Sequence, residues 1–121
     1  MDKQKQVLVK LEILKDDYNR KKRELDETMT AVEQEKWRFK RELEELSEQM
    51  RYIFHKREYN DSNSVQQAYR MISATQEESE WAIKKVVKKL DDEQEEQQAV
   101  YKQQVLSYEE ELHQLKKESG T

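Results

Sequence analysis

The chain has 121 residues, of which 41% are charged and 34% hydrophobic, and its formal net charge is −4. This composition is typical of long helices and coiled coils, and it leaves too few apolar residues for a thick globular core. The acidic balance disfavours nucleic acid as a partner, because proteins that bind phosphates usually carry a basic face. With no cysteine, disulfides and thiolate metal sites are excluded. We expect a soluble, cytoplasmic chain, since the apolar stretch at residues 7–14 is broken by charges and is too short to span a membrane.

A repeat of large apolar side chains predicts a first helix over about residues 3–58. One side chain recurs every seven positions, and a companion lies three or four positions further on. The repeat comprises Leu11, Tyr18, Leu25, Val32, Phe39, Leu46 and Ile53, and the companions are Val7, Leu14, Met29, Leu43 and Met50. We expect both sets to form a single apolar seam along the helix.

The stretch YNDSNS, residues 59–64, gathers turn-forming residues in a chain that has no proline and one glycine. Asn and Asp tolerate the left-handed backbone that a sharp corner needs. Ser64 followed by Gln67 fits a capping box, which marks the start of a helix. The sequence therefore predicts a corner near residues 59–64 and a second helix over about residues 64–118.

The second helix carries an apolar seam that mirrors the first about Asp61. Its large apolar residues are Val65, Tyr69, Ile72, Ile83, Val87, Leu90, Tyr101, Val105, Tyr108, Leu112 and Leu115. The mirror pairs Leu14 with Tyr108, and Tyr18 nearly with Val105, as a hairpin requires and a continuous helix does not. We therefore predict an all-α fold, a long antiparallel two-helix hairpin resembling a coiled coil, in one domain over residues 1–121. A flexible break in one long helix is the alternative.

Two polar residues, Gln94 and Gln97, occupy seam positions of the second helix. The spacing of the following apolar residues also departs from a strict seven-residue repeat. We expect looser packing between the helices in this region.

Enzyme chemistry finds little support in the sequence. The single glycine, Gly120, lies at the C-terminus, so the chain has no phosphate-binding loop, and no nucleophile sits in a catalytic elbow. We expect no catalytic residues and no cofactor, and therefore no enzyme activity.

One short motif suggests a metal ion. Glu110 and His113 form a Glu-x-x-His pair, and the mirror places Glu12 opposite Glu110. Doubled in a symmetric dimer, these residues would supply the ligands of a di-metal helical bundle. Solvated charge near the ends of the helices is the more ordinary interpretation, and we predict no metal site.

Two helices cannot enclose a core, so the chain is expected to finish its burial against other helices as an interaction protein. Trp37 and Trp81 each precede a seam residue by two positions and should point away from the seam. Exposed tryptophan is a typical interface anchor. An indole resting on lysine stems is the alternative.

Aromatic residues also gather on both sides of the predicted corner, at Tyr52, Phe54, Tyr59 and Tyr69. They are expected to close the end of the hairpin by local packing. Alternatively, they form an exposed recognition end in which Phe54 and Glu58 make an aromatic-x-x-x-acid step. The candidate partner-binding residues are Trp37, Trp81, Tyr52, Phe54, Glu58 and Tyr59.

In its size, its mirrored seams and its polar corner, the chain resembles the WXG100-like proteins of Gram-positive type VII secretion. It departs from their pattern in two places, because the corner NDSNS has no Trp-x-Gly and the aromatic-x-x-x-acid step FHKRE ends the first helix instead of following the second. More particularly, it is similar to the small α-helical partners of LXG toxins. The resemblance implies a cytoplasmic targeting factor or chaperone that binds the helical N-terminal domain of a toxin. It also implies a second small helical protein as a further partner, and export of the chain together with its partner.

Two other classes remain open from the sequence. One is a structural homo-oligomeric coiled coil, in which the outward residues make a homodimer. The other is a hairpin chaperone or stalk component of flagellar or type III export systems.

Overall fold

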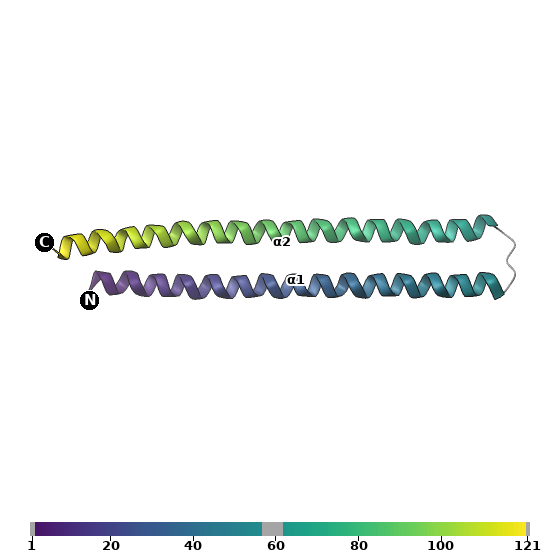
Figure 1. Ribbon diagram of the computed structural model, residues 1–121, viewed down its shortest axis with the longest axis horizontal. Helices are drawn as coiled ribbons and strands as arrows, with labels where there is room; N and C mark the ends of the chain where they lie inside the picture. The colour runs from purple at the N-terminus through teal and green to yellow at the C-terminus, as the bar shows by residue number, and fades with distance from the viewer. Residues whose placement is uncertain (1, 57–61, 121) are drawn as a thin grey trace. The chain divides into compact units, whose positions relative to one another are not determined.

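The computed structural model describes residues 2–56 and 62–120, and it contains two helices (Figure 1). Helix α1 is Lys3–Lys56 and helix α2 is Ser62–Ser119. Proline is absent from the sequence and the one glycine follows α2, so no helix breaker interrupts either helix. The described residues contain no strand, and the predicted fold class, an all-α antiparallel two-helix hairpin, is confirmed.

The start of α1 is capped by the side chain before it. The backbone N–H of Gln4 donates to Oδ1 of Asp2 at 3.1 Å, and that of Gln6 donates to the Asp2 carbonyl oxygen at 3.2 Å. Asp2 is therefore the N-cap, a position for which Asp is among the best residues.

Helix α2 begins at Ser62, two residues before the predicted start at about residue 64, and contains Ser64 in its first turn. Ser64 is thus not the cap of this helix. Asn, Asp and Ser are similarly good caps, so a run of them does not fix where a helix begins. Residues 57–61, which include the predicted end of the first helix and most of the predicted corner, lie outside the described residues.

The contacts within the chain divide it into two units. Unit 1 is Met1–Thr28 with Lys89–Thr121, and unit 2 is Met29–Lys88. Within each unit a stretch of α1 lies antiparallel beside a stretch of α2 (Figure 1). Because both units use the same two helices, this division does not test the prediction of a single domain.

Unit 1 contains Val7, which is 2% exposed and is the one fully buried side chain among the described residues. The rings of Tyr18 and Tyr101 stack with their centroids 4.1 Å apart and their planes 6° apart. This ring contact is one helical turn away from Val105, the expected neighbour of Tyr18. The side-chain amide of Gln4 donates to Oγ of Ser119 at 3.2 Å, which links the two helices again.

Looser packing around Gln94 and Gln97 stays a prediction, because a hollow lies beside Gln97 in unit 1 and another lies beside Ser47 in unit 2. Gln97 is half-buried, as its seam position predicts. A hollow open to solvent lies beside it, lined by Leu14, Asp17, Tyr18, Lys21, Glu96, Gln97, Val100, Tyr101 and Gln104.

Unit 2 has a seam that differs from the predicted one near its end. The half-buried residues of α1 here are Met29, Val32, Phe39, Leu43, Ser47, Met50 and Phe54, and those of α2 are Val65, Ala68, Tyr69, Ile72, Ser79, Ile83 and Val87. Leu46 and Ile53 were predicted in the seam but are 44% and 46% exposed, so this part of the prediction is wrong.

The geometry of the α-helix explains this difference. A straight helix turns every 3.6 residues, so a strict seven-residue repeat drifts by about 20° per repeat around it. Over the repeats from Leu11 to Ile53 the drift reaches roughly 120°. The repeat therefore leaves the seam, and Ser47 and Phe54 take the places predicted for Leu46 and Ile53.

Candidate protein-interaction site

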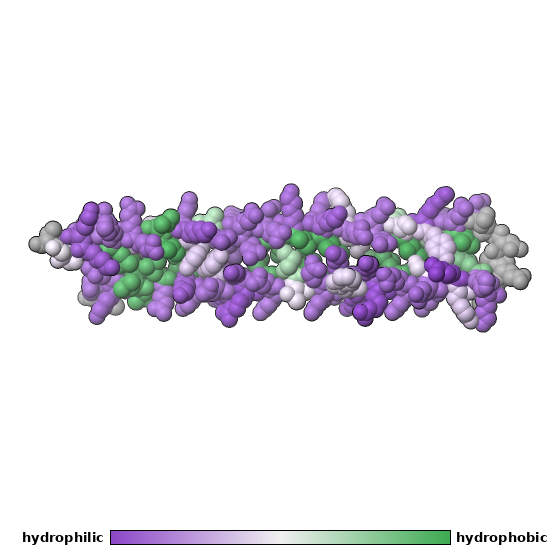
Figure 2. All heavy atoms as spheres, viewed as in Figure 1, coloured by the Kyte–Doolittle hydropathy of each residue, from purple (hydrophilic) through white to green (hydrophobic). Residues whose placement is uncertain are grey.

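The visible face of the molecule is mostly hydrophilic, but apolar side chains show between the helices and in patches beside them (Figure 2). Side chains of both seams are largely half-buried rather than fully buried. Two packed helices cover only one side of each seam, so the other side stays open to solvent or to a partner.

The two tryptophans point away from the seam, as predicted. The exposed fractions of Trp37 and Trp81 are 59% and 61%. Nζ of Lys40 lies 5.3 Å from the ring centroid of Trp37, and Nζ of Lys85 lies 3.6 Å from that of Trp81. Exposed cation–π contacts of this kind contribute only about 0.5–1 kcal/mol, so a partner helix can displace the lysines at small cost.

The aromatic residues beside the corner do not behave as one cluster. The rings of Phe54 and Tyr69 contact each other across the two helices, with centroids 6.4 Å apart, and both residues are half-buried. Tyr52 is exposed instead, and its hydroxyl oxygen accepts a hydrogen bond from Nζ of Lys56 at 2.9 Å. Phe54 thus serves local packing, as expected, whereas Tyr52 does not take part in it.

The other two candidates, Glu58 and Tyr59, lie outside the described residues. The proposed aromatic-x-x-x-acid step from Phe54 to Glu58 is therefore not described by the structure.

Sequence reasoning missed an exposed apolar strip on one side of unit 2, which we call the apolar flank. Each of its residues directly precedes a half-buried residue of the seam, so each is rotated by about 100° from the seam in the same sense. Because α1 and α2 run antiparallel, the same rotation on both helices leads to the same face of the unit. The apolar flank comprises Leu46 and Ile53 of α1 with Met71, Ala82 and Val86 of α2, all of which are exposed.

The opposite side of unit 2, the polar flank, has a different composition. Each of its residues directly follows a half-buried seam residue, and these seam residues run from Phe39 to Val87. They are Lys40, Glu44, Glu48, Arg51 and His55 of α1 with Gln66, Arg70, Ser73, Glu80, Lys84 and Lys88 of α2. None of these side chains is apolar. The exposed apolar residues that flank the seam of unit 2 therefore all lie on the other side, where they are interspersed with the polar residues Arg38, Glu42, Gln49, Ser64, Gln67 and Glu78.

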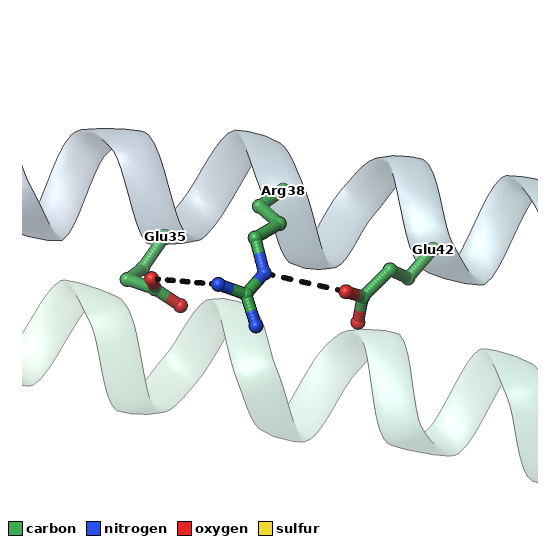
Figure 3. A network of polar contacts seen from close by, with 3 residues as sticks. All are labelled: Glu35, Arg38 and Glu42. Atoms are coloured by element: carbon green, nitrogen blue, oxygen red, sulfur yellow. Dashed lines mark hydrogen bonds and ion pairs between the residues drawn. The ribbon is translucent and has the colours of Figure 1, made fainter.

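Figure 3 shows an ion-pair cluster of α1. Two of its residues, Arg38 and Glu42, directly precede half-buried seam residues and so lie on the same side of α1 as Leu46. The guanidinium group of Arg38 lies between two carboxylates, with Nη1 3.5 Å from Oε1 of Glu35 and Nε 3.3 Å from Oε1 of Glu42. All three side chains are more than half exposed. Such exposed pairs contribute less than about 1 kcal/mol each, so the cluster satisfies its own charges without defining a binding site.

The described residues contain no group of three or more His, Asp or Glu side chains that could hold a metal ion. Within the same residues, no helix is long and apolar enough to cross a membrane.

Comparison of the chain with protein-family models, with curated proteins and with solved structures found no match.

Proposed function

We propose that this chain is a non-catalytic binding protein that completes its packing against helices of another protein. The observation that supports this proposal is the incomplete burial of its apolar residues. Val7 alone is fully buried among the described residues, while many large apolar side chains are exposed. Exposed apolar surface of this kind typically marks a contact with another protein.

A helical partner fits this surface better than a small molecule. The half-buried residues recur three or four positions apart along each helix, which is the spacing that an amphipathic partner helix presents in return. The hollows beside the seam are open to solvent, unlike the enclosed pockets that bind small ligands.

The resemblance to the partners of LXG toxins gives this proposal a specific client. That client is the helical N-terminal domain of a toxin, which the chain would deliver to a type VII secretion system together with a second small helical protein. Trp37 and Trp81 are the proposed anchors, since both are exposed and lie away from the contact between α1 and α2.

Capture of the N-terminal domain of a candidate LXG toxin tests the proposal. We expect the Trp37→Ala, Trp81→Ala double variant to bind the domain at least about 30-fold more weakly, as for loss of an interface hot spot. Its helicity by circular dichroism should be unchanged, because neither indole belongs to the seam. Leu106→Ala, which changes an equally exposed apolar residue, serves as the control and should bind normally.

Failure of the unmodified chain to bind the toxin domain would overturn the targeting role. A structural homo-oligomeric coiled coil would then be the better interpretation.

A further inference from the structure

We propose that the apolar flank of unit 2 binds the same flank of a second copy of this chain, in an antiparallel pair whose two-fold axis passes beside Leu46. This inference goes beyond the proposed function, because it concerns a different surface and a different partner. The tryptophans would contact the client, whereas the apolar flank would contact the second copy.

The apolar flank is the side of unit 2 on which burial would be favourable. Leu46, Ile53, Met71 and Val86 are all at least 44% exposed and lie on this one face. The polar flank carries only polar and charged residues, whose burial would have to be compensated by new hydrogen bonds. A partner that covers unit 2 therefore gains far more on the apolar flank.

The size of this face suits a modest dimer. The flank runs from residue 46 to 53 on α1 and from residue 71 to 86 on α2. Together these stretches cover roughly 25 Å along unit 2, and two packed helices are roughly 20 Å wide. One copy would then bury about 500 Å² and the pair about 1,000 Å², which is the size of a weak, transient interface. We therefore expect dissociation in the micromolar range.

The centre of the flank is complementary to itself in the antiparallel arrangement, whereas at its ends Ile53 lies opposite Arg38 and Val86 opposite Gln67 of the other copy. With Leu46 of the two copies facing each other, the mirror between α1 and α2 brings Met71 of one copy opposite Ala82 of the other. A long side chain thus meets a short one, and the symmetry repeats this contact on the other side of the axis. Such isologous pairing needs no second protein to explain it.

Charge also selects this arrangement. A parallel pair would place Glu42 of each copy opposite Glu78 of the other, and juxtaposed like charges are costly in an interface. In the antiparallel pair, Glu42 instead faces Gln49, whose amide can donate a hydrogen bond, and Glu78 faces the uncharged Thr75. Arg38 needs no charge from the other copy, since it is already paired with Glu42 of its own helix.

Single cysteines test the register directly, because the chain has no cysteine of its own. We expect Leu46→Cys to form a disulfide-linked dimer under mild oxidation, since its two copies face each other at the axis. Glu44→Cys, an exposed position on the polar flank, is the matched control and should stay monomeric under the same conditions. A mixture of the Met71→Cys and Ala82→Cys variants should form the mixed disulfide in preference to either homodimer.

Analytical ultracentrifugation of the full chain, alone, gives the affinity. We expect Leu46→Lys to raise the dissociation constant of the dimer at least about tenfold, because it places two like charges at the axis. Glu44→Lys should leave the constant unchanged. Circular dichroism of both variants should show unchanged helicity, because both positions are exposed.

Three results would overturn the inference. The first is a chain that is still monomeric at about 100 μM, well above the micromolar dissociation constant expected from the interface area. The second is equal crosslinking of Leu46→Cys and Glu44→Cys. The third is a Leu46→Lys dimer that is as tight as the dimer of the unmodified chain. Loss of client capture by Leu46→Lys with no dimer present would assign the flank to the client instead. If the chain is monomeric and binds the toxin domain through its tryptophans, this inference alone is overturned. If the chain forms the dimer but does not bind the toxin domain, the proposed function alone is overturned.

Discussion

In unit 1 the seven-residue repeat of α1 stays at the contact between the helices, where Leu11, Tyr18 and Leu25 are all half-buried. In unit 2 the same repeat leaves the contact and ends in the exposed Leu46 and Ile53. The two stretches have the same apolar spacing, so the difference arises from the 3.6-residue turn of the helix. A strict seven-residue repeat therefore predicts half-buried residues only over those turns in which its positions still face the other helix.

The largest expected effect concerns the aromatic stack of unit 1. Tyr101→Ala should lower the free energy of unfolding by about 2–3 kcal/mol, because it removes a half-buried ring together with its stacking on Tyr18. Val100→Ala, a change at the exposed neighbouring residue, should cost less than about 0.5 kcal/mol. Urea denaturation followed by circular dichroism measures both values, and equal losses would show that the stack is not part of the core.

A smaller effect separates the seam of unit 2 from its flank. Leu43→Ala should lower the free energy of unfolding by about 1–2 kcal/mol, since this half-buried side chain packs in the seam. Leu46→Ala should lower it by no more than about 0.5 kcal/mol in dilute solution, where the chain is monomeric. If Leu46 proved the more sensitive of the two in dilute thermal unfolding, the strict repeat would mark the seam after all.

The smallest effect is a stabilisation that makes unit 2 more like unit 1. Ser47 holds a half-buried seam position and lines a hollow beside Leu43 and Ile72. Ser47→Leu should fill this space and raise the free energy of unfolding by about 0.5–1.5 kcal/mol. Glu45→Leu, at an exposed position that does not line this hollow, should give no gain, and a similar rise in melting temperature for both variants would contradict the assignment.

Much of the fold followed from the sequence, because long helices depend on local patterns. The absence of proline, the apolar spacing and the mirror about the corner predicted two antiparallel helices, and Trp37 and Trp81 point outward as expected. The start of α2 did not follow, because several good capping residues stand in a row. The contact of Tyr18 with Tyr101 did not follow either, since long aromatic side chains reach a full turn along a neighbouring helix.

The apolar flank was hidden in the sequence for a similar reason. Leu46 and Ile53 fit the seven-residue repeat so well that they were placed in the seam, although Ser47 and Phe54 occupy it. Once the seam is placed by the true helical period, Met71, Ala82 and Val86 align with them on one side. A count at 3.6 rather than 3.5 residues per turn would have revealed the flank.

Because α1 and α2 pair in an antiparallel way, the chain entropy lost on forming a contact between them differs along the helices. Phe54 and Tyr69 are about 15 residues apart in the sequence, whereas Gln4 and Ser119 are 115 residues apart. Closing a loop costs about 0.6 kcal/mol of chain entropy for each doubling of its length, so the contact at the chain ends costs roughly 2 kcal/mol more if it forms first. Once the contacts nearest the corner exist, each further turn closes only a short additional loop. We therefore expect the helices to close progressively from unit 2 towards the termini, with the Gln4–Ser119 bond among the last to form.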